Sequence, residues 1–152
     1  MTIHNEQPLG RMIYFLAQDI RNLAEKVLAP YELTLEQFQT LKALSPAAGL
    51  TQRQLGMEIN KNPANMTRIL DRLEAKELTL RRQDPADRRA YLVFLTDKGK
   101  VLMDEVIEIF NDFSNQVHQG LTVEMKRMAR KVLGIMAANV RKIETARKKE
   151  QE

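Results

Sequence analysis

The chain has 152 residues, of which 43% are hydrophobic, and its 24 basic and 20 acidic side chains give a net charge of +4. This length suits one soluble domain with a sizeable core, and charges interrupt every apolar run before the ~20 residues that span a bilayer. With no cysteine, only two histidines far apart, and no basic-then-apolar leader pattern, we expect no disulfide, no metal site, no cofactor, no membrane partner and a cytoplasmic location.

The first predicted helix begins at Leu9 and ends at Pro30. Its apolar residues recur at three- and four-residue spacing, which places them on one helical face. They are Met12, Ile13, Leu16, Ile20, Leu23, Ala24, Val27 and Leu28.

Three shorter helices are predicted next, each from a start signal. The signals are Thr34 with Gln37, Thr51 with Gln54, and Asn62 with Pro63. In the first two, the side chains satisfy each other's free backbone amides, whereas Asn62 caps a helix whose first residue lacks the amide hydrogen anyway. The third helix runs through residues 64–75. Its inward residues are Met66, Ile69, Leu70 and Leu73, and its mostly outward ones are Asn65, Thr67, Arg68 and Arg72.

Residues 79–83 (TLRRQ) and 91–96 (YLVFLT) favour β structure, and the turn-like DPADRRA between them predicts a hairpin with a longer loop. No other β structure is predicted from the sequence. Residues 51–100 carry 11 basic and 7 acidic groups. Four of the basic groups belong to this ribbon, namely Arg81, Arg82, Arg88 and Arg89. Taken alone, such a tip is either a solvated turn or a surface shaped to contact an anion.

Two long helices are predicted after the ribbon, capped by Thr96 and Thr122. Their apolar faces include Leu102, Val106, Ile109, Phe110, Phe113 and Val117 in the first, and Met125, Met128, Ala129, Val132, Met136, Val140 and Ile143 in the second. With the first helix, the chain has three long apolar stripes. One small domain does not easily cover three such stripes, so we expect a partner chain to bury them.

The helices that begin at Thr51 and Asn62 resemble a helix-turn-helix, whose second helix enters the DNA major groove. A basic ribbon directly after such a pair forms a wing, and a wing arginine can enter the strongly negative minor groove. Within the wing loop, Asp87 is expected to hold a neighbouring arginine by a charge-assisted hydrogen bond to its guanidinium. A helical hairpin with a polar surface, followed by a solvated turn, is the alternative interpretation.

The run MTRILDRLEAKELTLRRQDPADRRAYLVFLTDKG, residues 66–99, closely resembles the recognition helix and wing of the MarR family of bacterial transcription regulators. Asp87-Arg88-Arg89, the Leu95-Thr96 pair and Gly99 carry the resemblance, and the order of helices extends it to about residues 9–146. It implies an obligate homodimer of winged helix-turn-helix subunits that is joined through its first and last two helices and binds pseudo-palindromic operators.

The resemblance also implies DNA-contacting residues. Arg89 matches the arginine that reaches the minor groove, Asp87 the acid that positions it, and Arg88 the variable place between them. Thr51 and Gln52 match the helix start that meets phosphate. The expected base-reading edge is Ala64, Asn65, Met66, Thr67 and Arg68, with Arg72 on the same helix and Arg81 on the next strand as further contacts.

One departure and one open question accompany the resemblance. Glu77 stands where the family usually has glycine in a left-handed cap, which costs a non-glycine residue about 1 kcal/mol. Ligand-responsive members bind aromatic anions between the DNA-binding lobe and the dimerisation helices. The candidate lining here is Arg11, Tyr14, Phe15, Phe38 and Phe110, and plain core packing or a solvated surface is the alternative for each.

The sequence therefore predicts a mainly α fold with a small β-wing, a winged helix-turn-helix plus long dimerisation helices, as one subunit over residues 1–152. Residues 34–96 are the DNA-binding lobe, and residues 9–30 with 97–146 are the dimerisation region. The expected function is that of a homodimeric, sequence-specific regulator of transcription, a repressor, with release by a small effector left open. A winged-helix protein-interaction module is the alternative. An enzyme is disfavoured because no catalytic constellation or phosphate-cradling glycine loop is found.

Overall fold

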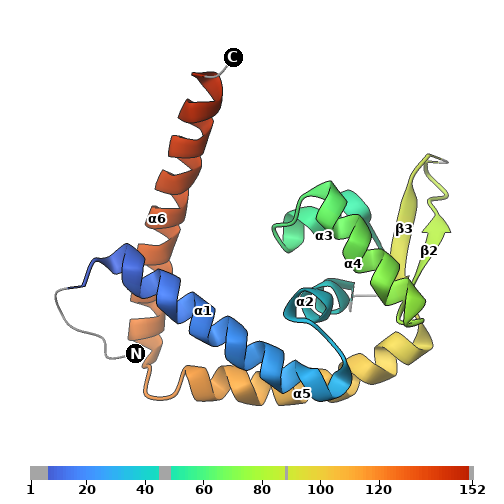
Figure 1. Ribbon diagram of the computed structural model, residues 1–152, viewed down its shortest axis with the longest axis horizontal. Coiled ribbons are helices and arrows are strands. Elements are labelled where there is room, and N and C mark those ends of the chain that lie inside the picture. Colours follow the sequence, from blue (N-terminus) through green and yellow to red (C-terminus); the bar gives the residue numbers. More distant parts are fainter. Residues whose placement is uncertain (1–6, 45–48, 88, 151–152) are drawn as a thin grey trace. The chain divides into compact units, whose positions relative to one another are not determined.

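A computed structural model describes residues 7–44, 49–87 and 89–150 (Figure 1). Its elements are α1 (Leu9–Leu28), a short 3-10 turn (Ala29–Tyr31), α2 (Leu35–Leu44), β1 (Leu50–Thr51), α3 (Gln52–Glu58), α4 (Pro63–Ala75), β2 (Thr79–Gln83), β3 (Tyr91–Leu95), α5 (Asp97–Val117) and α6 (Val123–Lys149). They form two compact units, Met1–Val117 and His118–Glu152. Within the described ranges, no helix combines the length and the apolarity that crossing a membrane requires. The mainly α fold with a small β-wing is confirmed.

The predicted capping side chains make the expected hydrogen bonds at the helix starts. In each case a side-chain oxygen accepts from a backbone N–H three residues later, a contact typically contributing about 1 kcal/mol. The pairs are Thr34 Oγ1 with Gln37 N (3.2 Å), Thr51 Oγ1 with Gln54 N (3.2 Å), Asn62 Oδ1 with Asn65 N (2.9 Å), Thr96 Oγ1 with Gly99 N (3.0 Å) and Thr122 Oγ1 with Met125 N (3.1 Å).

The sheet has a third strand that the sequence analysis missed. β2 and β3 pair along their whole length, from Thr79 opposite Leu95 to Gln83 opposite Tyr91. The two-residue β1 pairs antiparallel with the other edge of β3, so the order is β1-β3-β2. The expectation of a two-stranded ribbon was wrong because two residues carry no alternation pattern, and only the tertiary fold brings them beside β3.

The core of the first unit is built around α2, which contacts α1, α3, α4, α5 and β3. The rings of Phe38 and Phe110 pack there with 4.3 Å between their centroids. The inward face predicted for α4 is confirmed, since Met66, Leu70 and Leu73 are fully buried. Burial of this face fixes the rotation of α4 and leaves its polar face towards solvent.

The long helices leave much apolar surface exposed in the single chain. On α1, Ala24 and Leu28 are buried, whereas Leu16 and Leu23 are about half exposed. No side chain of α6 is buried, and most of its large apolar side chains are exposed. A typical monomer does not expose contiguous apolar stripes of this length, and such stripes mark interaction surfaces.

Candidate nucleic-acid interface

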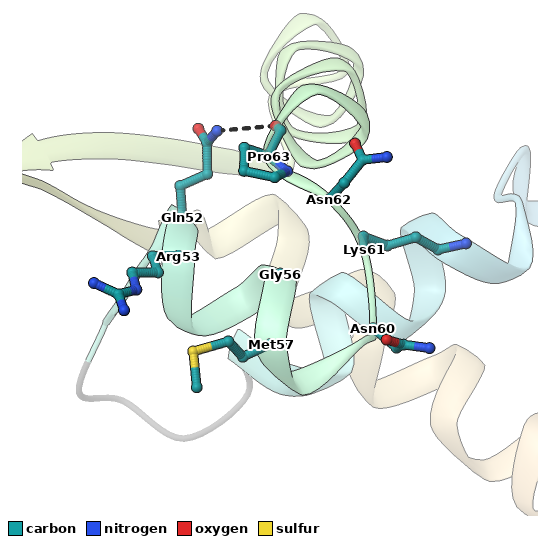
Figure 2. A pocket seen from close by; sticks show the side chains of 8 residues that line it. All are labelled: Gln52, Arg53, Gly56, Met57, Asn60, Lys61, Asn62 and Pro63. Carbon is teal, nitrogen blue, oxygen red and sulfur yellow. Dashed lines mark hydrogen bonds between the residues drawn. The ribbon is translucent and has the colours of Figure 1, made fainter. Parts of the chain in front are cut away.

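The turn between α3 and α4 holds the two helices close together. Lys61 N donates to Gly56 O at 2.8 Å, and a Cβ on Gly56 would lie only 2.9 Å from Lys61 O. Glycine is required here because any side chain would push the turn away. A cavity of about 690 Å³ opens beside this turn (Figure 2) and is lined by Gln52, Arg53, Gly56, Met57, Asn60, Lys61, Asn62 and Pro63.

The first turns of α4 present a polar face. Ala64, Thr67 and Arg68 are exposed, and Asn65 is partly buried. The Arg68 guanidinium donates from Nη2 to Asn65 Oδ1. Because a guanidinium has no acceptor, this bond fixes the amide with its oxygen towards Arg68 and leaves its NH2 group as a donor. Arg72 continues the exposed face one turn further.

Met66 does not belong to this surface. Its relative exposure is 0%, and it packs into the hydrophobic core cluster. Its inclusion in the base-reading edge was wrong, because the 3.6-residue period turns position 66 inward when 65, 67 and 68 face outward or sideways. The helical face that remains consists of Ala64, Asn65, Thr67 and Arg68.

Gln52 reaches from the start of α3 to the start of α4, as Figure 2 shows. Its Nε2 donates to Pro63 O at 3.3 Å and to Thr67 Oγ1 at 2.6 Å. The side chain is therefore engaged within the protein, whereas the sequence analysis expected a phosphate contact. Thr51, also expected at phosphate, closes its capping box with Gln54.

The wing tip is shaped by two aspartates that bind backbone amides. Asp84 Oδ1 accepts from Ala86 N at 2.8 Å, and Asp87 Oδ1 accepts from Arg89 N at 2.9 Å. Asp87 thus fixes the backbone at Arg89, and its predicted charge-assisted bond to a neighbouring guanidinium stays a prediction. The Arg89 side chain is exposed, and Arg88 lies outside the described residues.

The two arginines of β2 face opposite sides of the ribbon. Arg81 is partly buried against α4, where Nη2 lies 2.9 Å from Asp71 Oδ1 and Nη1 donates to Glu74 Oε2. Its charge is compensated by these two carboxylates, so it braces the wing against α4 and does not serve as a free phosphate contact. Arg82 is exposed on the other face, with its guanidinium 5.7 Å from the centre of the Phe94 ring.

The base of the wing is bonded to the end of α4. Glu77 has φ +61°, its N–H donates to Glu74 O, and Leu78 N donates to Leu73 O. This pair of bonds is a Schellman motif with a left-handed residue after the cap. Glu77 thus adopts the left-handed conformation that glycine usually takes at this place in the family. Thr96 Oγ1 then donates to Glu77 O at 2.6 Å.

Replacing Glu77 with glycine is expected to raise the free energy of unfolding by about 0.5–1 kcal/mol. Relief of the left-handed strain outweighs loss of the exposed Glu77–Lys98 ion pair (3.1 Å), since such pairs contribute little. Urea denaturation measures the change. Glu77→Ala is the matched control, because it removes the same carboxylate and keeps the left-handed strain. Its free energy of unfolding should not exceed that of the parent. Equal stability of both variants would contradict this account.

An ion-pair cluster missing from the sequence analysis joins α1, α2 and the helix-turn-helix. Glu36 Oε1 lies 2.6 Å from Lys61 Nζ and 3.4 Å from Arg21 Nη2. The hydrogen bond from Lys61 is the main cause that holds the pKa of Glu36 below its ordinary value, with Arg21 assisting and burial opposing. The sequence does not predict this cluster, because Arg21 and Lys61 lie 15 and 25 residues from Glu36 along the chain.

Glu36→Gln is expected to lower the free energy of unfolding at neutral pH by about 1 kcal/mol. Because the folded-state pKa of Glu36 is lowered, its stabilisation is present above the unfolded-state pKa and is lost as the pH falls through the folded-state pKa. The two proteins should therefore converge in stability in acid. Urea titrations at neutral pH and near pH 3 measure this, and a difference that stays constant with pH would contradict it.

The five candidate effector residues do not form one group within the described residues. Phe38 and Phe110 pack against each other, and Phe38 is buried in the core. Tyr14 and Phe15 form an edge-to-face pair on α1, and the Arg11 guanidinium lies 5.5 Å from the centre of the Phe15 ring. The exposed group on α1 thus combines a cation with aromatic faces.

The chain resembles known proteins both in sequence and in fold. The model of the MarR family matches residues 33–91. The multiple antibiotic resistance protein MarR of Escherichia coli (strain K12) is 32% identical over 115 residues, which are 76% of this chain and 78% of that protein. A mutant MarR from E. coli complexed with operator DNA aligns with a TM-score of 0.77 and 28% identity, over 90% of this chain and 99% of the other. The S. aureus MepR–DNA complex shares the fold, with a TM-score of 0.81 and 24% identity over 88% of this chain and 99% of the other.

Proposed function

The chain belongs to the MarR family, and we propose that it acts in the cytoplasm as a non-enzymatic transcriptional repressor that binds double-stranded operator DNA as a homodimer. The observation that carries this proposal is the exposed start of α4 beside an arginine-tipped wing on one lobe. A helix of this kind fits the major groove, and an exposed wing arginine fits the adjacent minor groove.

The proposed DNA contacts follow from which side chains are exposed and which are already paired within the protein. Arg89 enters the minor groove and Arg88 neighbours it, while Arg81 and Asp87 hold the wing in place from within the protein. Bases and phosphates are contacted from α3 and α4 by Thr51, Ala64, Asn65, Thr67, Arg68 and Arg72, while Gln52 holds the start of α4 through its bonds to Pro63 and Thr67. The DNA-binding lobe then spans residues 34–96.

The dimer is proposed from the apolar stripes of the long helices, in residues 9–30 with 97–146. The half-exposed leucines of α1 and the exposed face of α6 favour burial against a second copy, which is the usual route for a symmetric regulator. A small aromatic anion is proposed as effector, because Arg11 over Phe15 supplies a cation beside a ring.

Selection from a random double-stranded DNA library tests this function. We expect enrichment of a pseudo-palindrome with half-sites ~10 base pairs apart, bound at least about 1,000-fold more tightly than random DNA. Fluorescence anisotropy at fixed salt measures the ratio. Enrichment of no sequence would contradict the proposal and favour a protein-interaction module. Sedimentation equilibrium tests the dimer separately, and a stable folded monomer would exclude it.

A further inference from the structure

A second cavity, of about 280 Å³, lies between the start of α2 and one flank of α4. Lys61, which Figure 2 shows extending from the turn before α4, contributes to its wall. The lining combines one acidic, three basic, one amide and one apolar side chain, namely Glu36, Lys61, Arg68, Arg72, Asn65 and Ile69. Because its cations outnumber its carboxylate, the cavity suits an anion.

The carboxylate of the cavity is already shared between two cations. Glu36 Oε1 lies 2.6 Å from Lys61 Nζ and 3.4 Å from Arg21 Nη2. Arg68 donates to the neutral amide of Asn65, and in the part of the chain that the structure describes neither Arg68 nor Arg72 pairs with a carboxylate. The positive charge in the cavity therefore exceeds what Glu36 neutralises.

The cavity adjoins the helical edge that is proposed to read bases. Asn65, Arg68 and Arg72 follow one another at three- and four-residue spacing, so they lie along one flank of α4. A recognition helix in the major groove has the phosphates of the two DNA strands on either side of it. When the start of α4 contacts bases, this flank faces one strand, and Lys61 adds an ammonium group beside it.

We propose that Lys61 contacts a backbone phosphate of the operator in this cavity, together with Arg68 and Arg72, and that Glu36 holds the Lys61 ammonium in place while partly neutralising it. This rests on the proposed DNA-binding function and adds Lys61 and Glu36 to it. A phosphate contact carries no sequence information, so Lys61 contributes to affinity and not to base choice.

Lys61→Gln and Glu36→Gln break the same ion pair but should change operator binding in opposite directions. Lys61→Gln removes a phosphate contact, so binding should weaken about five- to tenfold for every sequence, and the slope of log affinity against log salt should become shallower by about one. Glu36→Gln leaves the Lys61 charge unneutralised and should strengthen binding about threefold. Fluorescence anisotropy over a series of salt concentrations measures both. If the pair serves stability alone, both variants change binding in the same direction, which would refute the inference.

Two controls separate this contact from net charge and from loss of structure. Lys98→Gln and Glu77→Gln make the same charge changes in an exposed ion pair (3.1 Å) outside the cavity, and each should change affinity less than about twofold. Lys61→Arg keeps the charge and should keep the parental salt slope. Effects of the control pair as large as those of Lys61→Gln and Glu36→Gln would overturn the inference, as would a salt slope of Lys61→Arg as shallow as that of Lys61→Gln.

Operators with single methylphosphonate substitutions locate the phosphate. Each substitution makes one phosphate uncharged. At one position in each half-site, Lys61→Gln should lose at least about threefold less affinity than the parent does, because the contact is already absent from the variant. A shallower salt slope without such a position would show that Lys61 acts through the diffuse potential or binds free anions, and the inference would be wrong.

The outcomes separate this inference from the proposed function. If the parent enriches an operator and Lys61→Gln keeps the parental affinity and salt slope, the inference is wrong and the function stands. If the parent enriches no sequence, both are overturned.

Discussion

Replacing Arg89 with alanine is expected to weaken binding of the selected operator about 10- to 100-fold, which corresponds to roughly 1–3 kcal/mol. The reason is the place of Arg89 at the exposed wing tip, where the bond from its backbone N–H to Asp87 Oδ1 fixes the point from which the side chain extends. The narrow minor groove is strongly negative, so a guanidinium that extends into it from a fixed backbone position gains electrostatic energy there.

Arg82→Ala is the matched control for Arg89→Ala. It removes the same charge from the same ribbon, but its side chain packs over Phe94 on the face opposite Arg81. We expect it to weaken binding less than about threefold, as loss of a diffuse charge does. Fluorescence anisotropy at fixed salt measures both, and sedimentation confirms that both variants keep the parental assembly. Equal losses would mean that the wing acts only through net charge.

Gly99→Ala is expected to lower the free energy of unfolding by about 3 kcal/mol, as severe overpacking does. A Cβ at position 99 would lie 2.2 Å from Leu78 O, and that oxygen accepts from Thr96 N. Because the clash involves a backbone oxygen, no side-chain rotation relieves it. The chain must instead separate α5 from the end of α4, which breaks the bonds from Thr96 to Glu77 and Leu78.

Gly10→Ala provides the comparison for this variant. Gly10 lies in α1, and no neighbouring atom lies within 4 Å of the position that a Cβ would occupy there. Alanine should therefore leave stability unchanged or raise it by up to about 1 kcal/mol. Urea denaturation of the two variants, followed by far-UV circular dichroism, measures the contrast. Parental stability of Gly99→Ala would show that the approach of α5 to Leu78 is not a structural requirement.

Local signals account for the parts of this fold that the sequence predicted. Capping residues such as Asn62 and Thr96 act within three or four residues, and their bonds form where expected. The same locality explains the misses. The pairing of β1 with β3 and the Glu36–Lys61 ion pair join segments far apart in the chain. The sequence pattern of one segment does not predict which distant segment it contacts.

The sequence predicted which residues form parts of the candidate site, but not the contacts that these residues make. Asn65, Thr67 and Arg68 were expected outward from helical periodicity, yet the internal bonds that orient them, from Arg68 to Asn65 and from Gln52 to Thr67, depend on side-chain geometry. Met66 was included in the predicted base-reading edge because it lies within the matched motif. The helical periodicity of α4 nevertheless indicated that its side chain is buried, as the structure shows. Where motif and periodicity disagree on an apolar residue, periodicity carries the physical information.

The bracing of the wing by Arg81 has a consequence for engineering. Asp71 and Glu74 on α4 hold Arg81 of β2. Thr96 bonds the end of β3 to Glu77 and Leu78 after α4, and Gly99 packs closely against Leu78 O. The helix and the wing are thus a single transplantable cassette, about residues 62–99 in extent. A chimera that exchanges only the helix or only the wing with a related protein would leave partly buried charges unmatched, whereas exchange of the whole cassette keeps every one of these bonds internal.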